Sequence, residues 1–363
     1  MSMRPILVMA GGTGGHVYPA LAVARALQAQ SLDVVWLGTH RGLESRVVPE
    51  AGIDIEWISI KGLRRKGLLA VLIAPLQIGW ALLQSLSVIL RRRPSAVLGM
   101  GGFVSGPGGV AAWLTRRPLV IHEQNAAAGM TNRLLARLAR VVLQAFPGSF
   151  NSDVDAETVG NPVREDIAAG APPHERYANR QGVLRVLVLG GSQGALALNR
   201  TVPAALALLD PEVRPVIRHQ CGERTLDIAK SSYDEHEVDV ELLPFIEDMA
   251  AAYAWADLVI CRAGALTVAE LCAVGVPALF VPYPAAVDDH QTANARPMAE
   301  AGAAMIVPED ELTPERLAEL LREWLQSRAA LQQRAAKARA LACPDSLRRI
   351  TEICLEQAGG AAA

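Results

Sequence analysis

Residues 5–16 read PILVMAGGTGGH, an apolar run that leads into a glycine-rich loop and ends on His16. A continuous apolar run is typical of a strand that is buried on both faces of a parallel sheet. After the loop, apolar residues recur at helical spacing from Val17 to Leu27, which predicts a helix. The stretch is therefore predicted to be a strand, a glycine loop and a helix start, as in a doubly wound α/β fold.

The glycine loop and His16 together suggest chemistry. Glycines adopt positive φ and let backbone N–H groups approach a ligand, and a helix N-terminus favours an anion. The loop is thus suited to a phosphate, or to charge that develops beside one. An imidazole at the mouth of such a loop can exchange protons near neutral pH. A loop that only tightens a turn and a purely structural histidine are the alternatives at this point.

The same order of elements recurs in the second half of the chain. An apolar run at 183–189 leads into GGSQG at 190–194 and then into a predicted helix at 195–209. Two half-chains that begin alike predict an α/β protein of two Rossmann-like domains facing each other across a cleft. A chain of 363 residues suits two domains.

Turn residues at 159–164, which read VGNPVR, mark the expected domain boundary. We expect an N-terminal domain over residues 1–163 and a C-terminal domain over residues 164–345. The last helix, within residues 346–363, is expected to pack back on the first domain.

Composition and spacing exclude several classes of function. A net charge of -2 gives no electrostatic support for a nucleic-acid partner. The five cysteines lie singly, as in a reduced cytoplasmic protein. We also expect no export, because the residues before the first predicted strand do not read as a signal peptide. The third glycine of a GxGxxG fingerprint falls on Val17, and the second predicted strand ends in Gly38 instead of an acidic residue. An NAD-dependent oxidoreductase is therefore disfavoured, and no cofactor is expected.

Residues 68–90 carry no charge and have basic residues on both sides, at Lys61, Arg64, Arg65, Lys66 and Arg91 to Arg93. The segment is long enough to span a bilayer. Pro75 and Gly79 interrupt it, however, and basic residues at both ends give no inside–outside asymmetry. A buried crossover helix is one interpretation. We favour a partly exposed helix that holds the protein on an anionic membrane surface.

Two further positions are candidates for a site. A strand at 119–121 runs into His122-Glu123-Gln124-Asn125, and open parallel sheets build sites at such strand ends. Glu123 and Asn125 are therefore candidates, although a polar strand end also caps helices. Glu270 lies one turn inside a short helix predicted at 266–273, which Gly275 is expected to end. It could bind sugar hydroxyls or be an ordinary solvated charge.

Five motifs and a further glycine cluster at 101–109 occur together, in the order GGTGGH, HEQN, GNPVR, GGSQGA and GALTVAE. On these motifs the chain, from about residue 5 to 355, resembles the MurG family of GT-B glycosyltransferases. The resemblance implies an inverting, metal-independent N-acetylglucosaminyltransferase of peptidoglycan synthesis. Its donor would be UDP-GlcNAc and its acceptor the 4-hydroxyl of MurNAc in undecaprenyl-pyrophosphoryl-MurNAc-pentapeptide. It further implies a peripheral protein on the cytoplasmic face of the bacterial inner membrane, linked to cell shape and to division proteins.

The resemblance also assigns residues to the donor. From the C-terminal domain the donor-binding residues would be Arg164, Ser192, Ile246, Ala265, Leu266, Thr267, Val268, Ala269, Glu270 and Gln291. From the N-terminal domain they would be Thr13, Gly14, Gly15 and Asn125. His16 would face the acceptor. Around Gln291 the chain departs from the family, because Pro284 to His290 replace the usual pair of neighbouring glutamines.

Three questions stay open at the level of sequence. Either His16 or Glu123 could be the general base. A divalent metal would need acidic ligands. The candidates are the pair Asp153 and Asp155 and the cluster at 288–290, but we expect no metal. A UDP-GlcNAc 2-epimerase, another UDP-sugar-using GT-B protein, or a non-catalytic binding protein are the alternative functions.

Overall fold

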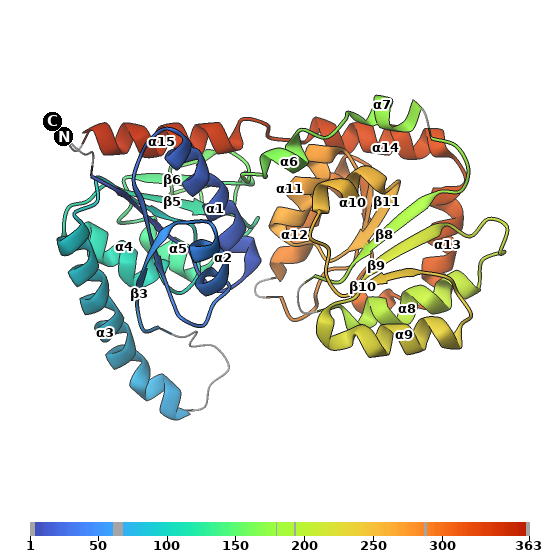
Figure 1. Ribbon diagram of the computed structural model, residues 1–363, viewed down its shortest axis with the longest axis horizontal. Coiled ribbons are helices and arrows are strands. Elements are labelled where there is room, and N and C mark those ends of the chain that lie inside the picture. The colour runs from blue at the N-terminus through green and yellow to red at the C-terminus, as the bar shows by residue number, and fades with distance from the viewer. Residues whose placement is uncertain (1–3, 61–67, 179, 192–193, 287–288, 361–363) are drawn as a thin grey trace. The chain divides into compact units, whose positions relative to one another are not determined.

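The structure is a computed structural model that describes residues 4–60, 68–178, 180–191, 194–286 and 289–360. The chain divides into two compact units (Figure 1). Unit 1 comprises residues 1–163 together with 345–363, and unit 2 comprises residues 164–344. Each unit is described by itself below.

Unit 1 alternates strands and helices along the chain. Its elements are β1 (Ile6–Met9), α1 (Gly14–Ala29), β2 (Val34–Gly38), α2 (Glu44–Glu50), β3 (Asp54–Trp57), α3 (Leu68–Arg92), β4 (Ala96–Gly99), α4 (Ser105–Leu114), β5 (Leu119–Glu123), α5 (Met130–Leu135), β6 (Val141–Gln144), β7 (Ala156–Thr158) and α15 (Ser346–Gly360).

The strands of unit 1 form a parallel sheet of seven strands in the order β3-β2-β1-β4-β5-β6-β7. β1 is central, and Val8 pairs with Trp36 of β2 on one side and with Leu98 of β4 on the other. All four residues of β1 are fully buried, which explains the continuous apolar run in its sequence. The glycine loop follows β1 at the carboxyl end of the sheet, beside the point where the strand order reverses. Open α/β sheets bind ligands at this position.

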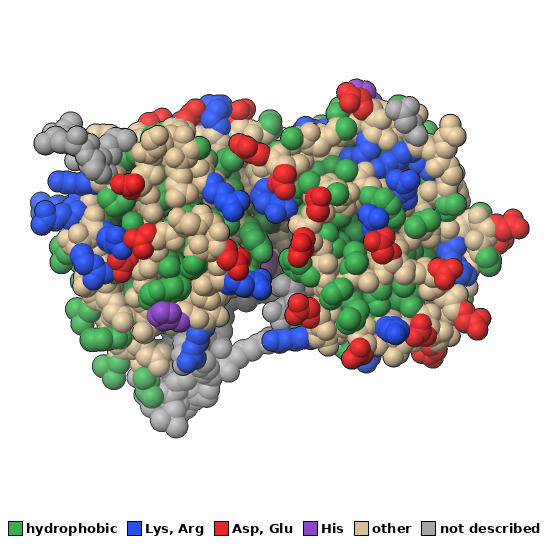
Figure 2. All heavy atoms as spheres, in the orientation of Figure 1, with side chains coloured by type: hydrophobic (Ala, Val, Ile, Leu, Met, Phe, Trp, Pro, Cys, Tyr) green, Lys and Arg blue, Asp and Glu red, His purple; other side chains and the backbone are tan. Residues whose placement is uncertain are grey.

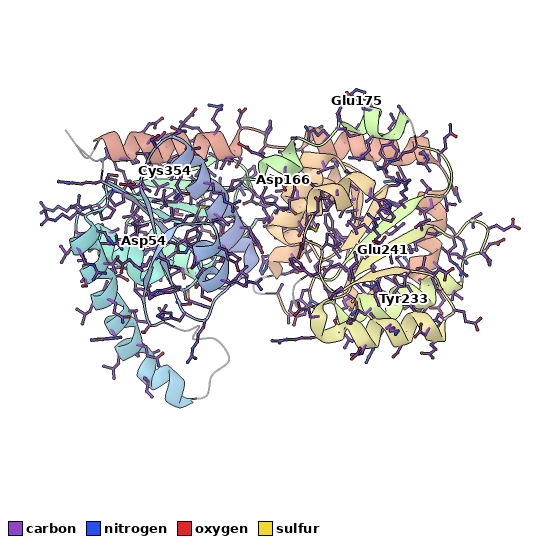
Figure 3. The ribbon with its side chains drawn as sticks, viewed as in Figure 1. Asp54, Asp166, Glu175, Tyr233, Glu241 and Cys354 are labelled. Atoms are coloured by element: carbon purple, nitrogen blue, oxygen red, sulfur yellow. The ribbon has the colours of Figure 1, made fainter. Side chains whose placement is uncertain are left out.

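The last helix, α15, belongs to unit 1 and packs on α1 and β4. Ile350, Ile353 and Cys354 are 0–2% exposed and join the core that contains Val17 and Leu21 of α1. Figure 3 labels Cys354 on this helix.

Helix α3 has two apolar sides. Ala81, Ser85, Val88 and Ile89 are buried against the unit, where α3 packs on α4. The opposite side carries exposed large apolar side chains, namely Ile73, Leu76, Trp80, Leu83 and Leu90. Within the described parts of the chain, Ile73–Arg92 alone is long and apolar enough to cross a membrane, by length and composition. Its packing on unit 1 makes it part of a folded domain with one apolar face left in solvent.

Unit 2 also alternates strands and helices. Its elements are α6 (Glu165–Ala168), α7 (Pro173–Ala178), β8 (Arg185–Leu189), α8 (Leu196–Ala207), β9 (Val216–Gln220), η1 (Glu223–Thr225), α9 (Leu226–Glu235), β10 (Glu241–Leu243), α10 (Met249–Trp255), β11 (Leu258–Cys261), α11 (Ala265–Val274), β12 (Ala278–Phe280), α12 (His290–Glu300), β13 (Ala304–Ile306), η3 (Glu309–Glu311), α13 (Pro314–Leu325) and α14 (Arg328–Ala340).

The strands of unit 2 form a parallel sheet of six strands in the order β10-β9-β8-β11-β12-β13. This order repeats that of unit 1, so both units are Rossmann-like and the predicted fold class is confirmed. Gly275 ends α11 in the left-handed conformation, with φ 69°, as predicted. Asp248 caps the short helix α10, which extends through Trp255, and β11 begins at Leu258.

Candidate active site

The first glycine loop is held in shape by a buried carboxylate that sequence analysis missed. Glu44 is fully buried, and its Oε2 accepts a hydrogen bond from the Gly12 N–H at 2.9 Å. Its Oε1 accepts from the N–H and the hydroxyl of Thr39, at 3.1 and 2.8 Å. Because the Gly12 N–H already donates to Glu44, it is not available to a phosphate, which disfavours the phosphate-cradle interpretation for this part of the loop.

A second glycine cluster packs against the first. Gly102 has φ 80°, and a Cβ there would lie 2.2 Å from the carbonyl oxygen of Gly11. Only glycine permits this approach of two backbones. The loop after β1 and the loop after β4 therefore pack backbone against backbone beside His16.

His16 lies in the first turn of α1 and is half-buried. Its Nδ1 is 2.9 Å from Oε1 of Gln124, a residue of the HEQN motif that sequence analysis did not select. The predicted donor contacts next to it are open to solvent: Thr13 and Gly15 are exposed and Gly14 is half-buried. An accessible imidazole thus stands beside an accessible loop.

Glu123 has a different environment from His16. Its side chain is 2% exposed, and Oε1 accepts from the N–H and the side-chain amide of Asn125, at 3.0 and 3.2 Å. Its Oε2 accepts from the Gly129 N–H at 3.0 Å and from Asn132 Nδ2 at 2.9 Å. Four donors hold the Glu123 carboxylate, so this side chain orders the loop that carries Asn125. With its oxygens already occupied, Glu123 is less suited than His16 to act as the base.

In unit 2, the glycine loop after β8 is tied to a neighbouring strand end by Gln220. Gln220 Oε1 accepts from the Gly191 N–H at 2.9 Å, and its Nε2 donates to the carbonyls of Gly191 and Pro244, at 3.2 and 3.0 Å. Pro244 lies two residues before the half-buried Ile246. The loop and the Ile246 segment are therefore side by side. Ser192 lies outside the described residues.

Helix α11 carries most of the other predicted donor contacts. It begins after Gly264 with no side-chain cap, and along its first turns Ala265 and Val268 are buried while Leu266, Thr267 and Ala269 are half-buried. Helix N-termini attract anions. This end of α11 is thus suited to a diphosphate.

Glu270, one turn further along, is not an ordinary surface charge. It is half-buried, and Tyr253 donates its hydroxyl to Glu270 Oε2 at 2.8 Å. Burial raises the pKa of Glu270 to about 7, and the Tyr253 hydrogen bond and the Arg164 charge partly oppose this shift. Arg164 stands at the start of α6, which packs on α11. Sequence analysis selected Arg164 and Glu270 but missed Tyr253, which lies 17 residues away along the chain.

Gln291 and the acidic pairs complete the predicted positions. Gln291 Oε1 accepts from the Tyr283 N–H at 2.9 Å, so this glutamine shapes the loop before α12. Asp153 and Asp155 are exposed in unit 1. Part of the 288–290 cluster, Asp288, lies outside the described residues. Across the parts of the chain that the structure does describe, no three His, Cys, Asp or Glu side chains are grouped to hold a metal ion.

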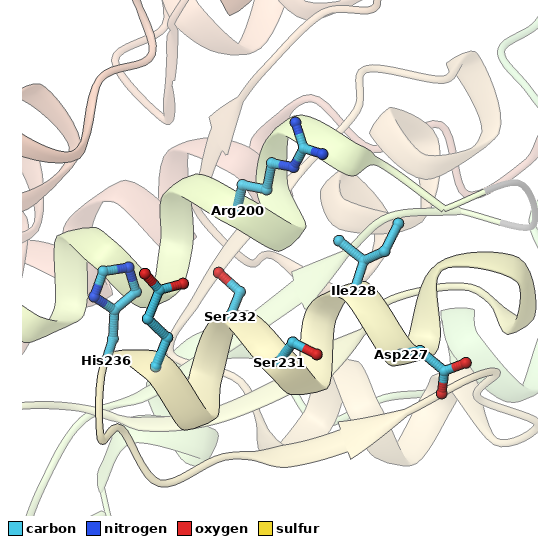
Figure 4. A pocket seen from close by; sticks show the side chains of 7 residues that line it. Arg200, Asp227, Ile228, Ser231, Ser232 and His236 are labelled. Carbon is cyan, nitrogen blue, oxygen red and sulfur yellow. The ribbon is translucent and has the colours of Figure 1, made fainter.

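One hollow in unit 2 is lined by none of the predicted site residues. It has a volume of about 520 Å³ and lies between α8 and α9 (Figure 4). Its lining residues are Arg200, Asp227, Ile228, Ser231, Ser232, Glu235 and His236. The hollow is open to solvent and mixes charges of both signs, so it is not assigned to the reaction.

Comparison with known proteins tests the family directly. The N-terminal domain model of glycosyltransferase family 28 matches residues 6–144, and the C-terminal domain model of that family matches residues 185–350. A relative from Alkalilimnicola ehrlichii is 59% identical over 98% of this chain and 99% of its own length. One from Marinobacter nauticus is 54% identical over 98% of each chain. Both are named UDP-N-acetylglucosamine--N-acetylmuramyl-(pentapeptide) pyrophosphoryl-undecaprenol N-acetylglucosamine transferase.

A solved structure agrees with these relatives. The crystal structure of MurG from Acinetobacter baumannii is 42% identical in sequence, covers 97% of this chain and 99% of its own, and superposes with a TM-score of 0.84. Since both domain models of the family match and the relatives are similar over nearly the whole chain, the chain belongs to glycosyltransferase family 28, among its MurG members.

Proposed function

We propose that this enzyme transfers N-acetylglucosamine from UDP-GlcNAc to the 4-hydroxyl of MurNAc in undecaprenyl-pyrophosphoryl-MurNAc-pentapeptide. Lipid I thereby becomes lipid II in peptidoglycan synthesis. The names of the relatives, at up to 59% identity over the whole chain, support this donor and acceptor. In one inverting displacement the hydroxyl oxygen bonds to C1 of the sugar, and the bond from C1 to the diphosphate breaks as UDP leaves.

The observation that carries the mechanism is the contrast between His16 and Glu123. The attacking hydroxyl needs a base with an accessible lone pair. Both oxygens of the Glu123 carboxylate already accept two hydrogen bonds each, whereas His16 is half-buried beside an open loop. His16 is therefore the proposed general base, and Glu123 is proposed to position Asn125.

The donor is proposed to bind unit 2. The diphosphate of UDP needs positive partners as it leaves, and the N-terminus of α11 with Arg164 supplies them. Ile246 and the Gly191 loop, which Gln220 brings together, are proposed to hold the uracil and the diphosphate with Ser192. Glu270 is proposed to accept hydrogen bonds from donor hydroxyls, and Gln291 to complete the sugar pocket. In unit 1, Thr13, Gly14, Gly15 and Asn125 are proposed as further donor-binding residues.

The acceptor is a membrane lipid, and α3 supports binding to a membrane surface. Figure 2 shows hydrophobic side chains along α3, at the lower left of the view. Leu76, Trp80 and Leu83 are 58–76% exposed there, and an exposed apolar patch of this kind marks an interaction surface. We propose a peripheral protein on the cytoplasmic face of the bacterial inner membrane, able to meet cell-wall and division proteins there.

Two arginines at the end of α3, Arg91 and Arg92, contribute less to a basic surface than the sequence suggests. Arg91 and Arg92 both pair with Glu56, at 2.5 and 2.6 Å, and Arg92 also pairs with Asp54, at 2.6 Å; Figure 3 labels Asp54. Both arginines are therefore already ion-paired within unit 1. Membrane binding by α3 is therefore proposed to rest on its apolar face, while Lys61 to Lys66 lie outside the described residues.

The first experiment measures transfer of labelled sugar from UDP-GlcNAc to a detergent-solubilised, lipid-linked MurNAc-pentapeptide. We expect transfer that persists in EDTA, because α11 and Arg164 serve the diphosphate, and that rejects UDP-glucose. His16→Ala should lower kcat by roughly 10² to 10⁴, whereas His174→Ala, at an exposed histidine of unit 2, should leave kcat unchanged. A His16→Ala enzyme with normal turnover would remove His16 from the role of base.

The same assay separates the alternatives. A UDP-GlcNAc 2-epimerase converts the donor without any acceptor, and a binding protein leaves the donor intact. Donor conversion in the absence of lipid, or binding without turnover, would overturn the transferase proposal.

A further inference from the structure

A chain of hydrogen bonds runs from His16 into the interior of unit 1. His16 Nδ1 is 2.9 Å from Gln124 Oε1. Gln124 Nε2 is 3.1 Å from His122 Nδ1, and His122 Nε2 is 2.9 Å from the carbonyl oxygen of Gly160. His122 and Gln124 are at most 1% exposed, so these hydrogen bonds are buried behind His16.

The hydrogen bond to the Gly160 carbonyl determines which ring nitrogen of His122 carries a proton. A backbone carbonyl only accepts hydrogen bonds, so His122 must carry a proton on Nε2. Burial lowers the pKa of His122 to about 4, so the ring is neutral at physiological pH. A neutral imidazole with a proton on Nε2 has a lone pair on Nδ1. His122 Nδ1 is therefore an acceptor.

Because His122 Nδ1 is an acceptor, the orientation of the Gln124 amide is fixed, and this in turn fixes the ring proton of His16. The side-chain amide nitrogen of Gln124 is the group that donates to His122 Nδ1, and it also donates to the His122 carbonyl at 3.2 Å. Two acceptors on one side fix the orientation of the amide, so its oxygen faces His16. An amide oxygen only accepts, and His16 must therefore carry its proton on Nδ1. The lone pair of neutral His16 is then on Nε2.

Gly101 closes this arrangement on one side. It has φ 89°, and a Cβ at this position would lie 2.7 Å from His16 Nδ1 and 3.4 Å from Gln124 Oε1. The backbone of the loop after β4 thus lies against the hydrogen bond between the two side chains. Among the described residues, the structure gives His16 Nε2 no hydrogen-bond partner.

We propose that Gln124, fixed by His122 and the Gly160 carbonyl, is a positioning residue that selects the Nδ1–H tautomer of His16 and so directs Nε2 at the acceptor hydroxyl. This inference rests on the proposed role of His16 as general base. As the hydroxyl oxygen bonds to C1 and UDP departs with the electrons of the broken bond, the hydroxyl proton passes to Nε2. Gln124 Oε1 then accepts from Nδ1–H of the imidazolium. Since the partner is a neutral amide instead of a carboxylate, the hydrogen bond at His16 Nδ1 adds no negative charge of its own.

The test is ¹⁵N NMR of the histidine-labelled full-length enzyme without substrate, with the His16 signals assigned by their loss in His16→Gln. We expect a protonated Nδ1 and an unprotonated Nε2 in the neutral ring of the wild type. Gln124→Leu should abolish this single tautomer and lower kcat by about 10- to 100-fold, while KM for UDP-GlcNAc stays near that of the wild type.

Two further variants separate positioning from folding. Gln124→Glu keeps an acceptor for His16 Nδ1–H, so the tautomer should persist, and its negative charge should move the acidic limb of the kcat profile to higher pH. Gln144→Leu makes the same change as Gln124→Leu at another buried glutamine of unit 1, which bonds Ser149 and Thr158. It should leave the His16 tautomer unchanged.

A wild-type His16 protonated on Nε2 would overturn the inference, even if Gln124→Leu failed to fold. So would a folded Gln124→Leu enzyme with the wild-type tautomer and kcat. Normal turnover by His16→Ala would instead contradict the proposed function, and the tautomer measurement, which needs no substrate, keeps the two failures apart.

Discussion

Glu270 is a half-buried carboxyl in unit 2 whose pKa burial raises to about 7. In the unfolded chain a glutamate titrates near 4.3, so between these values the folded chain binds more protons than the unfolded chain. Stability must then fall as pH rises through this window, and the loss is complete above pH 7. We predict that Glu270→Gln removes this loss and gains on the order of 1–3 kcal/mol over the wild type between pH 5 and pH 8.

The measurement is the free energy of unfolding of both proteins at several pH values, with Glu175→Gln as control. Glu175 is also in unit 2 (Figure 3), but its side chain is 63% exposed, so that variant should follow the wild type. Parallel curves for Glu270→Gln and the wild type would show that the carboxyl is not perturbed by folding.

The roles of single residues could be predicted where they depend on neighbours in the sequence. They could not be predicted where they depend on a partner far away along the chain. His16 and Glu270 stand out by their place in a loop and a helix. Glu44 reaches the Gly12 N–H across 32 positions, and Gln124 reaches His16 across 108. Such partners are chosen by the tertiary fold, so spacing along the chain carries no signal for them.

Strands, loops and helices could be predicted from the sequence where a single residue pattern is specific to one kind of element. Buried parallel strands need continuous apolar runs, which explains why β1 and β8 were predicted with their glycine loops. The short β7 is largely exposed and polar, so it has no such run. It is defined only by its pairing with β6.

The exposed face of α3 leads to a prediction about membranes. Leu76, Trp80 and Leu83 share one side of the helix and are 58–76% exposed. We predict that changing all three to Gln weakens binding to anionic lipid vesicles by at least about tenfold, because each removes apolar area that would leave water. Cosedimentation with vesicles measures this, and far-UV circular dichroism should be unchanged.

A matched control uses exposed apolar side chains elsewhere. Leu208 and Val213 are 46% and 64% exposed in unit 2, and changing them to Gln should leave vesicle binding as in the wild type. Equal binding by the α3 variant and the wild type would rule out this face as the membrane contact.

The chain returns to unit 1 only at its end, because residues 345–363 belong to the unit that residues 1–163 form. Ile350, Ile353 and Cys354 are 0–2% exposed in its core, and burial of each apolar side chain contributes roughly 1.5–3 kcal/mol. Loss of all three is comparable to the whole stability of a typical domain, about 5–15 kcal/mol.

We predict that a chain ending at residue 344 loses the fold of unit 1 and keeps that of unit 2. Hydrogen exchange read by mass spectrometry should show β1 and α1 unprotected while β11 and α11 stay protected. A peptide of residues 345–363 added in excess should restore protection to β1 and α1, because it binds the folded unit alone and shifts the folding equilibrium by mass action. A peptide with Ile350 and Ile353 changed to Asp should not. Equal protection of β1 with and without α15 would mean that the helix only covers a unit already stable without it, and loss of protection in both units would mean that the two do not fold independently.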